Sequence, residues 1–113
     1  NTTWDERYDV SLNTNAQGPG RLLEFAKKCK KLKLVLHVST AFINGERQGV
    51  FREKPLCSQE NTPVPFLDVN SELKLALDTV ESYHGSETIQ KLKELGTRRA
   101  KSYGWRNSYE MSK

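Results

Sequence analysis

The stretch that decides the fold is LKLVLHVST, residues 32–40. It is short, rich in leucine and valine, and apolar at consecutive positions from Leu34 to Leu36. That pattern is typical of a strand covered on both faces. Residues 9–31, which precede it, carry apolar side chains at helical spacing. A helix followed by a buried strand indicates an α/β fold with a parallel sheet.

The helical pattern before the strand is interrupted by Gly18, Pro19 and Gly20. Proline removes an internal helix donor, and glycine adds an entropic cost. The sequence therefore predicts a kink or a break at these residues, with the helix resuming at Arg21.

Beyond the strand, residues 41–66 are irregular and predict either a functional loop at the strand end or a short β excursion. Helical periodicity returns in NSELKLALDTVESY, residues 70–83, and in SETIQKLKELGTRRAKSYG, residues 86–104, and a last helix begins near residue 108. The N-caps expected for these three helices are, in turn, Asn70 or Ser71, Ser86, and Asn107 or Ser108.

The composition allows one small domain, with 113 residues, 35% hydrophobic residues and a net charge of +4. Five lysines crowd into residues 27–33. We interpret them as a solvated helix end that complements the helix dipole, with a patch for an anionic ligand or a nucleic acid as the alternative. No aromatic residues are interleaved with these lysines, so base stacking has little support and no nucleic-acid partner is predicted.

The two cysteines, Cys29 and Cys57, have no CxxC spacing and no companion histidine pair. The sequence therefore predicts no metal site, and reduced thiols of an intracellular protein are expected. No run of 18 apolar residues exists, so no transmembrane segment is predicted in this chain.

Two hydroxyl side chains, Ser39 and Thr40, close the predicted strand. Ligands of open α/β sheets bind beyond the carboxyl ends of the strands, so these hydroxyls are candidate site residues. The alternative is that they satisfy local backbone groups where the strand ends.

The final residues, NSYEMSK, contain a tyrosine and a lysine four positions apart, Tyr109 and Lys113. By composition alone, a lysine-rich chain with 4 tyrosines would contain roughly 0.4 such pairs. On a helix the two side chains share one face, and the lysine ammonium stabilises the phenolate form of the tyrosine. Such a tyrosine can give a proton to a carbonyl oxygen while hydride reaches the carbon, and a strand-end hydroxyl could hold the same oxygen.

Other polar and aromatic residues are interpreted structurally. Glu110 follows Tyr109 directly and is expected to point elsewhere on the helix. Trp4 and Trp105 are predicted to be packing anchors rather than substrate platforms. His37, alone in the predicted strand, is predicted to be a packed or hydrogen-bonded core residue rather than a ligand.

Several longer strings resemble one known family. They are NTTWDERYDVSLNTNAQG (1–18), LLEFAKKCKKLKLVLHVSTAFINGERQG (22–49), EKPLC (53–57), LDVNSELKLALD (67–78), KLKELGTRRAKSYGW (91–105) and NSYEMSK (107–113). Together with the YxxxK pair after a strand ending in VST, they resemble the reductase domain of plant-type fatty acyl-CoA reductases. That family, the male-sterility-protein family, belongs to the extended short-chain dehydrogenase/reductase superfamily.

The resemblance implies a Rossmann-type, doubly wound parallel sheet and the cofactor NADPH. The glycine-rich turn that binds the pyrophosphate in such folds is absent from the sequence. Residues 1–113 are therefore expected to be the central part of one NAD(P)-binding reductase domain that is incomplete at both ends. The isolated segment is expected neither to bind NADPH well nor to turn over.

The resemblance also implies roles for five residues. Tyr109 would be the proton donor, and Lys113 would stabilise its phenolate and contact the nicotinamide ribose, so that both residues bind the cofactor. Thr40 matches the catalytic serine or threonine, with Ser39 as the neighbouring candidate. Asn15 matches the helix asparagine that braces the site. Where the family shows YxFTK, this chain has YEMSK.

The reaction implied is the NADPH-dependent reduction of long-chain fatty acyl-CoA, through an aldehyde, to a fatty alcohol for wax or pollen-wall lipid. The implied compartment is the endoplasmic reticulum or the plastid, and membrane association of the full-length protein is left open. One alternative is another extended short-chain reductase or epimerase that acts on nucleotide sugars. The others are an inactive truncated fragment and a basic binding module.

Overall fold

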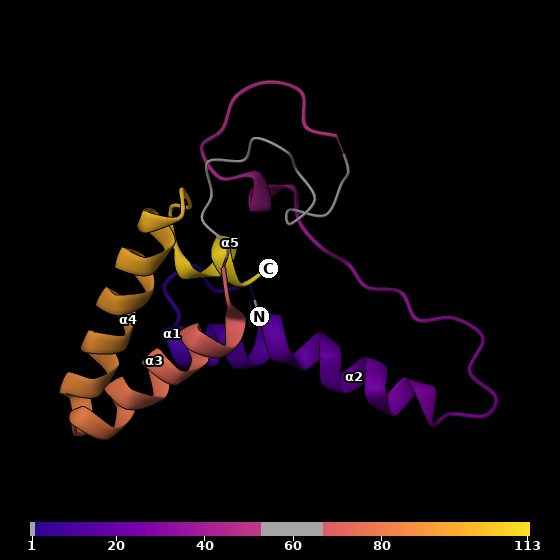
Figure 1. The fold of residues 1–113 in the computed structure, drawn as a ribbon, viewed down its shortest axis with the longest axis horizontal. Helices are drawn as coiled ribbons and strands as arrows, with labels where there is room; N and C mark the ends of the chain where they lie inside the picture. The colour runs from indigo at the N-terminus through magenta and orange to yellow at the C-terminus, as the bar shows by residue number, and fades with distance from the viewer. Residues whose placement is uncertain (1, 53–66) are drawn as a thin grey trace.

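The computed structural model describes residues 2–52 and 67–113, and their regular structure is helical throughout (Figure 1). The elements in chain order are α1 (Tyr8–Ser11), the π-helical turn η1 (Leu12–Gln17), α2 (Gly18–Lys27), the 3-10 turn η2 (Ala41–Asn44), α3 (Val69–Ser82), α4 (Gly85–Ser102) and α5 (Ser108–Ser112). Helices α3 and α4 lie side by side, α2 projects away from them, and the short α5 lies near the N-terminus.

The first helical region continues from Tyr8 to Lys27, so of the predicted kink or break at Gly18–Gly20 the break is wrong. The irregularity is instead the π turn η1, which ends just before Gly18. Pro19 then falls in the first turn of α2, directly after the π turn, where the hydrogen-bond register of the helix has already changed. The proline is thus accommodated by the wider turn that precedes it.

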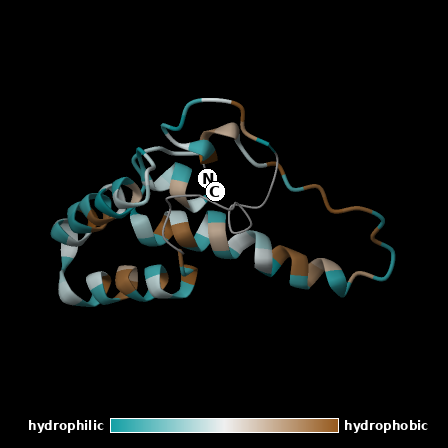
Figure 2. Cartoon of the chain, turned by 45° about the horizontal axis from the view of Figure 1, so that its top comes forward, coloured by the Kyte–Doolittle hydropathy of each residue, from teal (hydrophilic) through white to brown (hydrophobic). Residues whose placement is uncertain are grey.

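The predicted strand at residues 32–40 is absent, and the described residues contain no strand and hence no parallel sheet. This segment leaves the helices as an open loop that is largely hydrophobic in sequence (Figure 2), and its apolar side chains are exposed. Leu34, Leu36 and Val38 are 75–80% exposed. A strand forms only against a neighbour, and the described ranges supply no second strand to pair with it. The part of the predicted loop at 53–66, with Cys57, lies outside the described residues.

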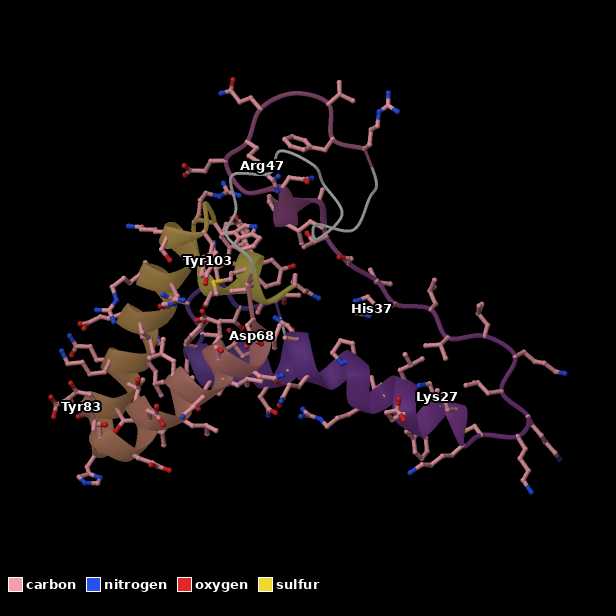
Figure 3. All side chains as sticks on the ribbon, viewed as in Figure 1. Lys27, His37, Arg47, Asp68, Tyr83 and Tyr103 are labelled. Atoms are coloured by element: carbon pink, nitrogen blue, oxygen red, sulfur yellow. The ribbon has the colours of Figure 1, made fainter. Side chains whose placement is uncertain are left out.

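The predicted helices at 70–83 and 86–104 are confirmed as α3 and α4, but their caps differ from the prediction. Asp68, not Asn70 or Ser71, caps α3: its carboxylate accepts the Asn70 N–H at 3.0 Å and the Ser71 hydroxyl at 2.8 Å (Figure 3). Helix α4 begins at Gly85, one residue before the predicted cap Ser86.

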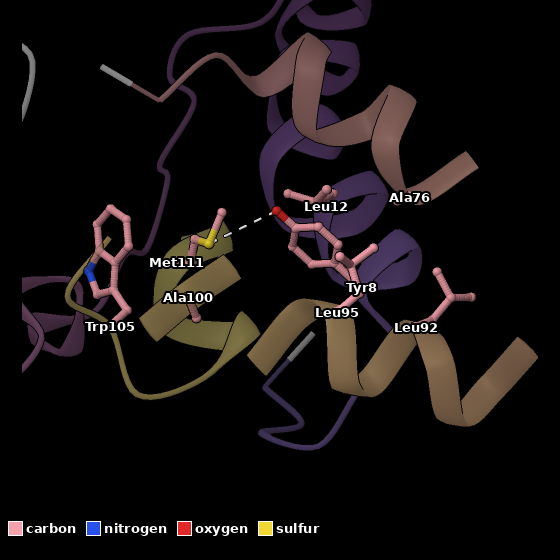
Figure 4. Close-up of a cluster of buried hydrophobic side chains, with 8 residues drawn as sticks. All are labelled: Tyr8, Leu12, Ala76, Leu92, Leu95, Ala100, Trp105 and Met111. Atoms are coloured by element: carbon pink, nitrogen blue, oxygen red, sulfur yellow. Dashed lines mark hydrogen bonds between the residues drawn. The ribbon is translucent and has the colours of Figure 1, made fainter. Parts of the chain in front are cut away.

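The hydrophobic core lies where α1, η1, α3, α4 and α5 meet (Figure 4). Its centre is Tyr8, which is fully buried and whose hydroxyl lies 4.0 Å from the Sδ of Met111. The other members are Leu12, Ala76, Leu92, Leu95, Ala100 and Trp105. Gly96 lets α4 approach this centre closely, because a Cβ there would lie 3.1 Å from the Tyr8 Cβ and 3.2 Å from the Ser108 Cβ.

A buried carboxylate, Glu72 of α3, joins the helices around this core. It accepts hydrogen bonds from the Tyr8 hydroxyl at 2.6 Å and from Arg99 Nε at 2.9 Å, and Arg99 Nη2 forms an ion pair with it. The Tyr103 hydroxyl lies 3.4 Å from the same carboxylate. Elements far apart in sequence are thus fixed to one side chain.

The protonation of this cluster follows from its contacts. Burial raises the pKa of Glu72, but the hydrogen bonds from Arg99 and Tyr8 outweigh it, so the net pKa lies below the ordinary value of 4.5. Burial, together with the hydrogen bond to Glu72, raises the pKa of Tyr8 well above its ordinary value. Glu72 is therefore charged and Tyr8 neutral at neutral pH.

Replacing Glu72 by glutamine should destabilise the protein, because Arg99 and Tyr8 lose their charged acceptor. We expect a loss of about 2–3 kcal/mol in the free energy of unfolding, at the low end for a broken buried pair because Arg99 is partly exposed. Urea unfolding of the full-length protein measures this loss. Glu94→Gln, which breaks the exposed pair with Lys91, is the matched control and should leave the midpoint unchanged. Equal shifts in both variants would contradict the assignment.

The lowered pKa of Glu72 also predicts how stability depends on pH. Because its folded-state pKa lies below the unfolded one, its contribution is fully present above about pH 4.5 and is lost as the pH falls through the folded value. The difference in unfolding free energy between wild type and Glu72→Gln should therefore be constant near neutrality and shrink at acid pH. A difference that grew on acidification would refute this sign.

Candidate active site

Helix α5 carries the tyrosine and the lysine of the YxxxK motif on one turn. The backbone N–H of Lys113 donates to the Tyr109 carbonyl at 3.2 Å, so the two residues stand in the helical i, i+4 relation. The Lys113 Nζ lies 5.8 Å from the centroid of the Tyr109 ring. This distance places the ammonium over the ring face, in the range of a cation–π contact.

The short α5 is formed by polar contacts at its start. Asn107 caps it, as one of the predicted alternatives, by accepting the Glu110 N–H at 3.0 Å. The buried Glu110 carboxylate turns back to Arg106, accepting from its Nε at 2.8 Å and its backbone N–H at 3.1 Å. The hydrogen bond and the charge of Glu110 raise the pKa of Arg106. The prediction that Glu110 points away from Tyr109 is confirmed.

The π turn η1 delivers Asn15 to the same helix. Asn15 is buried, and its Nδ2 donates to the Ser112 hydroxyl at 3.0 Å. That hydroxyl in turn donates to the Tyr109 carbonyl at 3.1 Å. Asn15 therefore braces the turn that holds Tyr109. The sequence analysis did not identify Ser112, and the only signal near η1 was the Gly-Pro-Gly that follows it.

The two strand-end hydroxyls have different surroundings. Thr40 caps η2, and its hydroxyl accepts the Phe42 N–H at 3.3 Å, which is the local backbone role given as the alternative. Ser39 is exposed. The turn η2 is held beside α5 because the Trp105 Nε1–H donates to the Ile43 carbonyl at 2.6 Å. Asn15, Tyr109 and Lys113 are thus brought together directly, whereas Thr40 joins them only through η2.

The two tryptophans differ from one another. Trp105 is a buried packing anchor, as predicted. Trp4 is 52% exposed, contrary to that prediction, and its ring stacks on Tyr109 with centroids 6.3 Å apart and planes 8° from parallel. Phe42 meets Trp4 edge-on at 5.5 Å. These spacings are those of favourable aromatic pairs.

A hollow of about 670 Å³ lies beside Lys113. It is lined on one side by helical residues, among them Thr14, Asn15 and Pro19, and on the other by residues 35–38. Its size is in the range of small-molecule sites. His37, which lies on the open segment in Figure 3, borders it and is exposed, so the prediction of a packed core histidine is wrong.

Within residues 2–52 and 67–113, no group of three or more histidine, cysteine, aspartate or glutamate side chains could hold a metal ion. The helices found in these ranges are all too short or too polar to cross a membrane.

Comparison with known proteins shows which sequences this chain is similar to. The model of the NAD-binding family described as male sterility protein matches residues 1–113. "Fatty acyl-CoA reductase 2, chloroplastic" of Arabidopsis thaliana is 48% identical over 122 residues that include 100% of this chain. "Fatty acyl-CoA reductase 1" of the same plant is 42% identical over 116 residues, with 99% of this chain covered. "Alcohol-forming fatty acyl-CoA reductase" of Simmondsia chinensis is 40% identical over 114 residues, with 96% covered.

The matched part is a small share of each relative. It amounts to 20% of the first protein, 24% of the second and 23% of the third. The chain therefore spans about a fifth to a quarter of the length of the curated relatives it matches.

The contact between Asn15 and Ser112 can be tested by a double-mutant cycle. Asn15→Leu and Ser112→Ala each remove one partner of a buried hydrogen bond, and the pair should show a coupling of about 1 kcal/mol in urea unfolding. A cycle between Asn15→Leu and Thr79→Ala, whose hydroxyl bonds within α3, serves as the control and should show additive effects. Additive effects for Asn15 and Ser112 would mean that this bond does not hold η1 to α5.

Proposed function

The chain belongs to the male sterility protein family, and from this membership we propose that it is part of an enzyme that reduces long-chain fatty acyl-CoA, through the aldehyde, to a fatty alcohol. The observation that carries the proposal is the Tyr109–Lys113 pair on α5, braced by Asn15. The name of one relative, "Alcohol-forming fatty acyl-CoA reductase", supports the alcohol as product. Use of the alcohol in wax or pollen-wall lipid is part of the proposal.

We propose further that residues 1–113 are the central part of one NAD(P)-binding domain with a doubly wound parallel sheet. In that fold residues 32–40 are a strand. The exposed apolar side chains of Leu34, Leu36 and Val38 support this, because pairing within a sheet covered on both faces would bury them. Exposure of such side chains to water costs free energy, and we therefore expect other parts of the sheet domain to bury them.

The cofactor of this family is a nicotinamide nucleotide, and we propose NADPH. When bound, the cofactor supplies a hydride to the carbonyl carbon. The residues present fit its ribose, because the Lys113 ammonium is a hydrogen-bond donor and the polar side chains of Thr14 and Asn15 lie beside it on the helical side of the hollow. The Tyr109 hydroxyl is the other group assigned to contact the ribose.

Tyr109 is proposed as the proton donor. As the thioester carbon is reduced, the tyrosine hydroxyl gives its proton to the carbonyl oxygen, which yields a hemithioacetal. The C–S bond then breaks, coenzyme A leaves as the thiol, and the aldehyde remains. After Tyr109 regains a proton from solvent, a second hydride, from a second reduced cofactor, and a second proton from Tyr109 would give the primary alcohol. The Lys113 ammonium stabilises the phenolate left on Tyr109 after each transfer.

Thr40 is proposed to hold the reacting oxygen, with Ser39 as the neighbouring candidate. The Thr40 hydroxyl accepts a hydrogen bond from Phe42 and keeps its own hydrogen free to donate. The cap role seen in η2 is thus compatible with donation to a substrate oxygen.

Reduction of a nucleotide sugar has less support, because relatives named fatty acyl-CoA reductases match over nearly the whole chain. We propose the endoplasmic reticulum or the plastid as the compartment. The plastid is supported by the relative named as chloroplastic.

Tyr109→Phe should abolish most of the activity of the complete open reading frame product. Loss of the proton donor should lower kcat about 10²- to 10⁴-fold, and Lys113→Met should cause a loss of similar order. The assay follows NADPH oxidation with hexadecanoyl-CoA and identifies hexadecanol by gas chromatography. Tyr83→Phe, at the distant end of α3, is the matched control and should keep wild-type kcat. Full activity in Tyr109→Phe would refute the assigned role, and an inactive wild type would refute the proposed function.

A further inference from the structure

A row of rings and cations crosses the candidate site. Lys113 lies over Tyr109, Tyr109 stacks on Trp4, Trp4 meets Phe42, and the Arg106 guanidinium lies 5.7 Å from the centroid of Phe42. Its members come from the N-terminal segment, from η2 and from the region of α5. The apolar middle of this row, Trp4 and Phe42, is called here the aromatic wall.

The two rings of the aromatic wall are exposed, whereas the aromatic side chains beside them are buried. Trp4 and Phe42 are 52% and 46% exposed, whereas the neighbouring Trp105 and Tyr109 are 5% and 7% exposed. Among the aromatic rings of this row, the buried one is thus the proposed proton donor, and the two exposed ones are Trp4, which stacks on it, and Phe42, which contacts Trp4. Large apolar rings in water are a cost unless something apolar covers them in the working state.

The position of Trp4 restricts how a substrate reaches Tyr109. The indole lies almost parallel to the phenol ring, with centroids 6.3 Å apart, so a substrate whose carbonyl reaches the Tyr109 hydroxyl has the exposed Trp4 ring as a neighbour. In a fatty acyl thioester the carbonyl is followed directly by methylene groups. Methylenes pack favourably against aromatic faces, whereas the phosphates of coenzyme A do not.

We propose that the aromatic wall contacts the first methylenes of the acyl group, and that Trp4 in addition positions the Tyr109 ring. This inference rests on the proposed function, because it names the part of the substrate that the same site recognises. Phe42 acts on substrate affinity alone. Trp4 acts on affinity and, through its stack on Tyr109, on the rate of proton transfer.

The two roles predict different kinetic signatures. Phe42→Ala should raise KM for hexadecanoyl-CoA about 10-fold with little change in kcat, the pattern of lost ground-state contact. Trp4→Ala should raise KM similarly and also lower kcat about 10-fold, because the phenol ring is no longer fixed. Trp4→Phe, which keeps an aromatic face, should restore most of both parameters.

The experiment uses the complete open reading frame product, steady-state kinetics with hexadecanoyl-CoA, and calorimetric titration with hexadecanoyl-CoA and with free coenzyme A. The aromatic-wall variants should weaken binding of the acyl thioester and leave the affinity for coenzyme A unchanged. Ile89→Ala removes a comparably exposed apolar side chain from α4 and should behave as wild type. Should Trp4→Ala fail to fold, Phe42→Ala and Trp4→Phe decide the matter.

The outcomes separate this inference from the proposed function. A wild type that reduces hexadecanoyl-CoA while Trp4→Ala and Phe42→Ala match Ile89→Ala would overturn the aromatic wall and leave the reductase intact. Equal loss of affinity for coenzyme A and for hexadecanoyl-CoA would also overturn it. A wild type without acyl-CoA reductase activity would overturn both.

Discussion

The structure depends on one buried carboxylate. Glu72 faces Tyr8, Arg99 and Tyr103, which come from α1 and from the end of α4, and it holds them by hydrogen bonds and an ion pair. An unpaired charge at such a position would be costly, so the cluster stabilises the fold only when all its donors are in place. The same Tyr8 is the centre of the hydrophobic core. The position of α1 against α3 and α4 is therefore determined by the hydrogen bonds and the ion pair of Glu72 as well as by the burial of apolar side chains.

The candidate site uses this frame without sharing its residues. Helix α4 approaches Tyr8 and Ser108 closely at Gly96, which fixes the start of α5 against α1. The π turn that continues α1 then carries Asn15 to Ser112. The buried Tyr109 lies in the short helix α5 and Lys113 follows its last residue, and the helix is held at both ends, by the Asn107 cap and by Asn15. The proton-donor role that we propose for Tyr109 requires such a fixed position.

Much of the helical structure could be predicted from sequence, because periodicity and capping are local properties. The helices at 70–83 and 86–104 and the Asn107 cap follow from residues within one or two turns. The strand at 32–40 could not be decided in the same way, because a strand needs partners that are distant in the chain. Tyr109 was identified by its spacing from Lys113, and Asn15 through the family resemblance. The contact of Asn15 with Ser112 spans 97 positions and leaves no local pattern. The exposure of Trp4 likewise depends on the arrangement of three separate segments.

The π turn at Leu12–Gln17 also sets a rotational phase. Each residue of an α-helix turns the next side chain by about 100°, so the one extra residue in a π turn rotates everything that follows by about that angle relative to a regular helix. The side of α2 that borders the hollow is therefore not the direct continuation of the side of α1 that packs on the core. Deletion of one residue from this turn would leave a regular α-helix. It would also rotate the helix after the deletion relative to the helix before it, so that either Asn15 or α2 would lose its present contacts.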